Sequence, residues 1–246
     1  MKRILLVGGG TGGHIYPLIA VAEELKKLAQ EKSLNLELMA VADSNVWRNE
    51  FESQGIRFKK ILAPKIRRVE GGRINFLALL ALPITLIQSL WLLFVFMPDI
   101  VFSKGSFSSI IPSLVSRLYF IPVFIHESDS IPGRAVRIIA KSAKKVFISF
   151  ESSASYFPAQ KTLLSGNPIR ENLLRGSKNE AGGFFNLDPA KKTALFLAGS
   201  QGALFFNNLL ISSLVELTKN LQIIHQAGPK NFDLAAQEID KIKKEG

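Results

Sequence analysis

The stretch VGGGTGGH at residues 7–14 joins an apolar run, residues 4–7, to a helical pattern that we expect to open near Pro17. Proline suits a first helical turn because its nitrogen carries no hydrogen to leave unpaired. The five glycines of the stretch let the backbone adopt positive φ and bring free amide hydrogens close to an anion. The stretch therefore predicts a strand, a glycine turn suited to phosphate, and a helix.

Three interpretations of this turn are open from the residues alone. Gly8, Gly10 and Gly13 satisfy the G-x-G-x-x-G dinucleotide pattern, which needs an acid about 20 residues later. The candidate acid, Asp43, lies 30 residues after Gly13. His14, at the mouth of the turn, could instead take a proton from an attacking hydroxyl while glycine amides hold a phosphate. The third interpretation is a plain glycine turn whose histidine caps the helix.

Composition limits the possible classes of protein. With 246 residues, 47% of them hydrophobic, the chain can form one large or two modest domains. The absence of cysteine excludes disulfides, thiolate zinc sites and cysteine nucleophiles, and it fits a cytoplasmic setting. A histidine-rich metal site is not expected, because His14, His126 and His225 are far apart in the sequence.

The net charge of +11 is concentrated in the first part of the chain, with +9 in residues 1–169 and +2 in residues 170–246. Nucleic acid, an anionic membrane or a phosphorylated substrate could explain this excess. We expect no nucleic acid, because neither a zinc finger nor a basic strand interleaved with aromatic residues is present. The charged start is followed by only four apolar residues, which is too short for a signal peptide.

Strand-like and helix-like runs alternate along the first part of the chain. This alternation predicts a doubly wound parallel sheet, with ligands bound at the carboxyl ends of the strands. We expect strands at residues 36–42, 56–62, 98–102, 121–125, 146–150 and 162–165, and helices at residues 45–54 and 134–144.

A basic segment leads into an uncharged run of 24 residues, Ile74 to Met97. The run is long enough to span a bilayer, but polar residues interrupt it and Pro83 would kink it. We favour a helix that lies in the membrane interface, with nearby cations on anionic headgroups. The alternative is a buried crossover helix beside a solvated basic loop. Flotation with anionic liposomes distinguishes the two.

Polar residues follow two of the expected strands. Residues 103–109 form a small-residue turn that is a second candidate ligand loop. Residues 126–133, HESDSIPG, follow the strand expected at 121–125, and a carboxylate there could act as a base or bind a hydroxyl. The alternative is helix capping by Ser130 or Asp129.

The opening pattern recurs after a proline- and glycine-rich boundary at residues 166–170. We therefore predict an α/β protein with two Rossmann-like halves that face each other across a cleft, residues 1–168 and residues 169–246. The second half is expected to contain a strand at 193–197, a glycine turn at 198–202, a helical run at 204–217 and a strand at 221–225.

Four motifs together resemble the MurG family of peptidoglycan N-acetylglucosaminyltransferases. GGGTGGHIYP, HESDSIPG, SGNPIR and AGSQGA occur in the order and spacing of that family. The resemblance implies a GT-B fold, UDP-N-acetylglucosamine as donor and a lipid-linked acceptor on undecaprenyl pyrophosphate (lipid I, converted to lipid II). It also implies peripheral attachment to the cytoplasmic face of the inner membrane.

The resemblance also implies roles for individual residues. His14 corresponds to the general base on the acceptor 4-hydroxyl. Two motifs depart from the family: Asp129 stands where asparagine is usual, and Ala198 where glycine is usual. The residues implied to bind the donor diphosphate are Thr11, Gly12, Gly13, Arg170, Ser200, Gln201 and Gly202, and those implied at the acceptor or cleft are Lys104, Gly105, Glu127 and Asp129.

Inverting glycosyl transfer needs a base for the nucleophilic hydroxyl and a cationic or amide-lined site for the departing diphosphate. His14 can supply the first, while Arg170 and the helix after Ser200 can supply the second. No acidic metal-binding pair is evident in the sequence, so we expect no metal and no cofactor other than the co-substrate UDP-N-acetylglucosamine.

The chain stops two expected strands into the second half, where family members continue for roughly another hundred residues, the size of a completed domain. We expect a C-terminally truncated chain with an incomplete second domain. The alternative is a non-catalytic, membrane-docking half that binds the acceptor and needs a partner chain for the donor. A nucleotide-dependent oxidoreductase is a third hypothesis, which the long gap to Asp43 disfavours.

Overall fold

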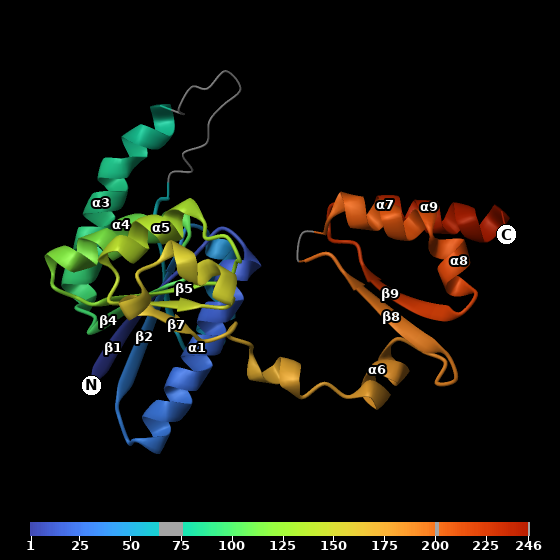
Figure 1. The fold of residues 1–246 in the computed structure, drawn as a ribbon, viewed down its shortest axis with the longest axis horizontal. Coiled ribbons are helices and arrows are strands. Elements are labelled where there is room, and N and C mark those ends of the chain that lie inside the picture. Colours follow the sequence, from blue (N-terminus) through green and yellow to red (C-terminus); the bar gives the residue numbers. More distant parts are fainter. Residues whose placement is uncertain (64–75, 200–201, 246) are drawn as a thin grey trace. The chain divides into compact units, whose positions relative to one another are not determined.

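The computed structural model describes residues 1–63, 76–199 and 202–245, which form two compact units, Met1–Leu174 and Arg175–Gly246 (Figure 1). The sequence-based boundary, after Pro168, was placed too early. Residues 169–174 stay with the first unit because two of them contact helix α1 (Gly12–Glu31): Arg170 stacks on Tyr16, and Glu171 forms an ion pair with Lys27.

The first unit is built on one seven-stranded sheet in which every neighbouring pair of strands is parallel. The strand order is β3-β2-β1-β4-β5-β6-β7, so the direction of winding reverses between β1 and β4. Ligand sites in such sheets lie at the carboxyl ends of the strands beside this reversal. The strands are β1 (Lys2–Val7), β2 (Leu36–Ala42), β3 (Arg57–Lys60), β4 (Ile100–Ser103), β5 (Val123–Glu127), β6 (Lys145–Ile148) and β7 (Thr162–Leu164).

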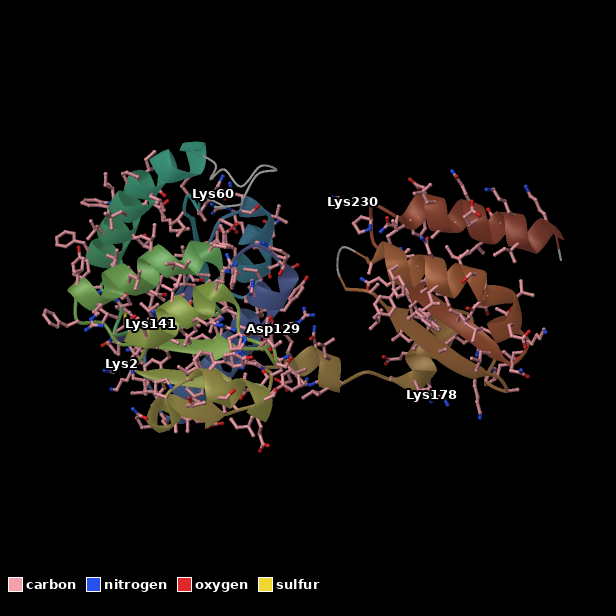
Figure 2. All side chains as sticks on the ribbon, turned by 45° about the horizontal axis from the view of Figure 1, so that its top comes forward. Lys2, Lys60, Asp129, Lys141, Lys178 and Lys230 are labelled. Atoms are coloured by element: carbon pink, nitrogen blue, oxygen red, sulfur yellow. The ribbon has the colours of Figure 1, made fainter. Side chains whose placement is uncertain are left out.

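Helices cover both faces of this sheet. They are α1 (Gly12–Glu31), α2 (Arg48–Glu52), α3 (Phe76–Phe96), α4 (Phe107–Leu118) and α5 (Arg134–Ser142), with short 3-10 turns η1 (Asn45–Trp47), η2 (Glu151–Tyr156), η3 (Ala159–Lys161) and η4 (Glu171–Leu174). Charged side chains such as Lys2, Lys60 and Lys141 are exposed around this unit (Figure 2).

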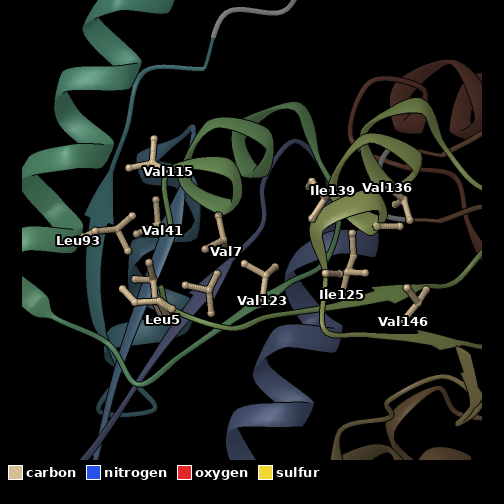
Figure 3. Packing of buried hydrophobic residues seen from close by; sticks show 14 of the residues in the cluster. Leu5, Val7, Val41, Leu93, Val115, Val123, Ile125, Val136, Ile139 and Val146 are labelled. Carbon is tan, nitrogen blue, oxygen red and sulfur yellow. The ribbon is translucent and has the colours of Figure 1, made fainter. Parts of the chain in front are cut away.

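Each face of the sheet has its own apolar core because side chains alternate along the strands. Leu5 and Val7 of β1 join Leu93, Val115 and Ile139 in the core under α3, α4 and α5 (Figure 3). The neighbouring β1 side chains, including Leu6, pack on the other face against α1 and α2. The doubly wound parallel sheet predicted from the sequence is therefore confirmed.

Helix α1 begins earlier than the sequence indicated. It starts at Gly12, with Thr11 in the extended N-cap conformation, and Pro17 lies inside the helix. Because the helix starts at Gly12, Pro17 lies beyond its first turn. Pro17 has no amide hydrogen, so the Gly13 carbonyl lacks the hydrogen bond that it would receive in an unbroken helix. His14 therefore lies in the first turn of α1.

Strands β4 and β5 are displaced toward the C-terminus relative to the predicted ranges. Pro98 and Pro122 have no amide hydrogen to donate to the ladder, and both strands begin only after them. As a result, His126 and Glu127 belong to β5 itself and not to the loop that follows it.

Helix α3 is a crossover between β3 and β4 with one buried face. Leu93 and Phe96 are buried in the core, and the buried Thr85 hydroxyl donates to the Leu62 carbonyl at 2.8 Å. Its other face is exposed to solvent. Residues 74 and 75 of the predicted run lie outside the described residues. Within the described parts of the chain, no helix has the length and apolar character needed to cross a membrane.

The second unit contains β8 (Lys192–Leu197) and β9 (Leu221–Gln226), which pair in parallel. Its helices are α6 (Lys178–Phe184), α7 (Leu204–Ser212), α8 (Leu214–Thr218) and α9 (Phe232–Glu245). The helix predicted as one run is interrupted at Ser213. Helix α6 lies after the boundary segment and was not predicted, and its start is explained by Ser177, whose hydroxyl accepts the Glu180 amide.

Candidate functional site

A cavity of about 410 Å³ lies at the carboxyl ends of β1, β4 and β5. Its walls come from the glycine turn before α1, the turn before α4 and the loop before α5. This is the position expected for a ligand site beside the reversal of strand order. Among the predicted site residues, the cavity is lined by His14, Gly105, Glu127 and Asp129.

The glycine turn is held in place by an aspartate and a serine from other elements. The Gly10 amide donates to Asp43 Oδ1 at 2.9 Å, and Ser108 Oγ donates to the Gly8 carbonyl at 3.0 Å. Gly9 has φ +156°, and a Cβ there would overlap both Ser108 Oγ and Asp43 Oδ1. Asp43 therefore fixes the turn, and the Gly10 amide is not free for a phosphate as we had expected.

The motif residues after this turn form the start of α1. Thr11 is exposed and its side chain makes no capping hydrogen bond. Gly12 and Gly13 are the first two residues of the helix, where backbone amides have no intrahelical acceptor. Their amides are the part of the predicted anion cradle that the fold leaves available, and their contact with a diphosphate stays a prediction.

His14 presents a neutral imidazole to the cavity. Its backbone amide donates to the Thr11 carbonyl at 3.0 Å, and its Nδ1 is buried with no hydrogen-bond partner among the described residues. Burial, followed by the nearby Lys104 cation, lowers its pKa to about 4, while Asp129 and Asp43 oppose that shift. The ring is therefore unprotonated at neutral pH and able to accept a proton.

The turn before α4 adds a buried cation. Lys104 is only 2% exposed, and its backbone amide donates to the Val7 carbonyl at 2.9 Å. Burial lowers the pKa of its ammonium group to about 8, against the opposing effect of Glu127 and Asp129. Gly105 has φ +75° and no room for a side chain, because a Cβ would overlap Val136.

The candidate ligand loop at residues 103–109 places serines at the start of α4, where Ser106 and Ser108 line the cavity. Ser106 and Ser109 form a capping box at the start of the helix. Ser106 Oγ also lies 2.6 Å from Ser108 Oγ, which itself contacts the first glycine turn. The short-range signal was the serine-rich stretch at 106–109, but its partners are about a hundred residues away.

Glu127 shapes the loop before α5. Its Oε1 accepts the Asp129 amide at 2.9 Å and its Oε2 accepts the Gly133 amide at 3.1 Å. Both oxygens of this buried carboxylate are thus engaged by the backbone, and its contact with an acceptor stays a prediction. The capping alternative was wrong, because the N-cap of α5 is Gly133 and no side chain caps that helix. Asp129 is exposed at the cavity rim (Figure 2).

Arg170 does not line this cavity. Its guanidinium carbon lies 4.1 Å from the centre of the Tyr16 ring, and Tyr16 packs edge-on against Trp47 at 6.1 Å. The Arg170 Nε is buried with no hydrogen-bond partner among the described residues. The guanidinium is therefore held by an aromatic face at the start of α1, and its role toward a diphosphate stays a prediction.

The glycine turn of the second unit is closed by Gly202, whose amide donates to the Gly199 carbonyl at 3.0 Å. Gly202 has φ +70°, and a Cβ there would overlap the Ala227 carbonyl. That carbonyl also accepts the Asn207 side-chain amide at 2.9 Å, and Asn207 Oδ1 accepts from His225 Nε2. Ser200 and Gln201 lie outside the described residues, and the predicted shared cleft stays a prediction.

The described residues contain no group of three or more histidine, aspartate or glutamate side chains placed to hold a metal ion. The expectation that no metal is required stays a prediction.

Comparison with known proteins identifies relatives over most of the chain. The Glycosyltransferase family 28 N-terminal domain matches residues 4–148. A Bacillus cereus "UDP-N-acetylglucosamine--N-acetylmuramyl-(pentapeptide) pyrophosphoryl-undecaprenol N-acetylglucosamine transferase 2" is 31% identical over 240 residues, which cover 96% of this chain and 66% of the relative. A Treponema pallidum transferase of the same name without the number is 34% identical, covering 94% of this chain and 60% of the relative. The chain thus spans two thirds or less of these relatives' length.

Solved structures show the same fold. MurG from Acinetobacter baumannii superposes with a TM-score of 0.66 at 23% identity, covering 97% of this chain and 64% of that one. A UDP-GlcNAc 2-epimerase from Methanocaldococcus jannaschii gives a TM-score of 0.65 at 15% identity, with 99% and 70% covered. The predicted α/β fold of the GT-B type is confirmed. By its sequence and its fold, the chain belongs to glycosyltransferase family 28.

Proposed function

We propose that this protein transfers N-acetylglucosamine from UDP-N-acetylglucosamine to the 4-hydroxyl of the muramyl residue of lipid I, giving lipid II. The observation that carries the proposal is the neutral His14 imidazole, which lies in the cavity wall. The names of the Bacillus and Treponema relatives support this choice of donor and acceptor.

In the proposed reaction, the acceptor hydroxyl oxygen attacks C1 of the sugar while His14 takes the hydroxyl proton. The bond from C1 to the UDP oxygen breaks, and UDP leaves with the electron pair, so the configuration at C1 inverts. A base with a low pKa is unprotonated, and hence ready to accept this proton, over the whole physiological pH range.

The departing diphosphate needs positive charge or oriented amides. We assign the guanidinium of Arg170 to this group. Within the second unit, the first amides of α7, which follow the turn closed by Gly202, are a candidate anion site of their own. The amides of Gly12 and Gly13, at the start of α1, donate hydrogen bonds to an anionic group of a substrate bound at the first unit.

The test is incubation of the chain with UDP-N-acetylglucosamine and a short-chain lipid I analogue, followed by mass spectrometry of the product. The expected product is a disaccharide, formed together with stoichiometric UDP. Failure of the chain to bind either substrate in calorimetric titration would contradict the proposal. Product that forms only after a second protein is added would favour the non-catalytic acceptor-binding half.

We further propose that the first unit binds an anionic membrane through α3, at the cytoplasmic face. The outward face of α3 exposes large apolar side chains, among them Ile87, Trp91 and Phe94, which are 59–67% exposed. A groove of about 460 Å³ separates α3 from β1–β3, and its wall includes Lys59 and Lys60, together with Arg3 and Arg57, which both pair with Glu37. An apolar face beside cations suits insertion among acyl chains under anionic headgroups.

Sedimentation with phosphatidylglycerol vesicles tests this surface. We expect salt-sensitive binding that is lost in Trp91→Ser and in Lys59→Glu, and no binding to neutral phosphatidylcholine vesicles. Val46→Ser is the matched control, because Val46 is 76% exposed in η1, which packs on the opposite face of the sheet. Equal binding by all variants would contradict the assignment.

A further inference from the structure

Residues 165–171, which we call the strap, lead from β7 into η4 and make hydrogen bonds and a ring contact to other parts of the first unit. His126 Nε2 donates to the Gly166 carbonyl at 2.9 Å, and Ser128 Oγ donates to Asn167 Oδ1 at 2.9 Å. Farther along, Arg170 stacks on Tyr16, and the Glu171 amide donates to Glu23 Oε2 at 3.2 Å. The first residues of the strap are therefore bonded to residues at the end of β5, and its last residues contact α1.

The His126 contact has a defined chemistry. A carbonyl oxygen only accepts hydrogen bonds, so Nε2 must carry the ring proton. His126 is 1% exposed and its Nδ1 has no partner among the described residues, so a second proton would create a buried, unsatisfied N–H. Burial accordingly lowers the pKa of this ring to about 4. The neutral, Nε2-protonated form persists at physiological pH.

Strand alternation links the strap to the cavity. Successive side chains of a strand point to opposite faces. Glu127 points to the cavity, where it holds the amides of Asp129 and Gly133. Its neighbours His126 and Ser128 hold the strap instead. Glu127 and His126 at the end of β5 thus fix the cavity loop and the strap respectively, and Ser128, the residue after the strand, adds a second bond to the strap.

We propose that His126 and Ser128 are positioning residues that hold the strap so that Arg170 stays stacked on Tyr16. Tyr16 lies on α1, two residues after His14. Without these bonds, residues 166–169 lose their side-chain hydrogen bonds, while the Ser165 amide still donates to the Ile148 carbonyl and the contacts of Arg170 and Glu171 remain at the far end. The consequence for catalysis, a correctly placed guanidinium, rests on the proposed function; the fastening of the strap does not.

Hydrogen exchange and fluorescence test the fastening without any assay of activity. The protein has two tryptophans, so in a Trp91→Phe background Trp47, which contacts Tyr16, is the single reporter beside Arg170. His126→Leu should make amide exchange over residues 165–171 about tenfold faster, the effect of removing one part-buried hydrogen bond, and should change Trp47 emission. His126→Gln should restore both, because its amide nitrogen takes the place of Nε2.

Ser128→Ala and Asn167→Ala provide milder variants in case the His126 change disturbs folding. Each should increase exchange over the same segment, and the double variant should do no more than either single one, because the two side chains share one bond. Unchanged exchange and emission in His126→Leu and in Ser128→Ala would overturn the proposal.

A double-mutant cycle tests the link to Arg170. In the glycosyl-transfer assay, His126→Leu and Arg170→Ala should each raise the KM for UDP-N-acetylglucosamine, and His126→Leu should add nothing in the Arg170→Ala background. Fully additive effects would overturn the positioning role. If no variant and no wild-type protein transfers sugar while exchange responds as expected, the proposed function fails and the fastening stands.

Discussion

The protonation state of His14 is determined by its burial and by the charges around it. His14 combines a buried ring nitrogen with a nearby buried cation, Lys104, and both lower its pKa. Removing that cation should therefore raise the pKa of His14 toward the ordinary value of 6.5. We expect Lys104→Met to make the ring accept its proton at a higher pH than the wild-type midpoint of about 4.

NMR titration of the His14 ring measures this midpoint directly. Lys144→Met is the control, because Lys144 is exposed at the opposite end of the sheet and should leave the His14 titration unchanged. A midpoint that stays the same, or falls, in Lys104→Met would show that Lys104 does not act on the imidazole.

Turns and helix starts, more than the regular elements, build the cavity. The tightest approach is at Gly9, where a Cβ would overlap Ser108 and Asp43. Gly9→Ala should therefore destabilise the protein by about 2–4 kcal/mol, through overpacking and backbone strain together. Gly10 has φ +85° but open space around its Cα, so Gly10→Ala should cost only the strain, about 1–2 kcal/mol.

Urea unfolding measures both variants. The difference between the unfolding free energies of the two variants measures the cost of placing a Cβ against Ser108 and Asp43. Equal destabilisation by Gly9→Ala and Gly10→Ala would mean that Ser108 and Asp43 move away freely.

Local patterns predicted most elements of the sheet but not their ends. The apolar run 36–42 became β2 as expected, because its signal lies within the strand itself. Prolines account for several errors in the predicted ends. Pro17 suggested a helix start near residue 17, but the helix begins at Gly12. Strands β4 and β5 begin later than predicted, after Pro98 and Pro122. Helix α6 begins with a local serine cap in a polar, glycine-rich segment that carries little helical signal.

The site was predictable only as far as its motifs were. Spacing identified His14 and the glycine turns, since those residues are neighbours in sequence. Asp43, Ser108 and the His126–Gly166 bond were not predictable as contacts, because each joins segments 33 to 100 residues apart. Such pairs depend on strand order, which local periodicity does not specify.

The chain divides into two compact units after Leu174, so each length of chain that contains the whole first unit should fold by itself. We expect residues 1–174 to fold alone with a cooperative melting transition. Residues 1–168, which lack the Arg170–Tyr16 stack and the Glu171–Lys27 ion pair, should melt a few degrees lower, because these contacts together are worth about 1–2 kcal/mol.

Differential scanning calorimetry compares the two lengths, with Arg170→Ala in residues 1–174 as the matched control for the stack. Identical melting temperatures for both lengths would place residues 169–174 outside the first unit.

The proposed reaction depends on His14 as its base. The most direct measurement is the rate of acceptor-dependent UDP release by His14→Gln, compared with wild-type protein at pH 7.5 and saturating substrates. We predict a loss of about 100-fold or more, the usual contribution of a general base, with acceptor binding retained. A rate within threefold of wild type would contradict the assignment of His14 and, with it, the proposed mechanism.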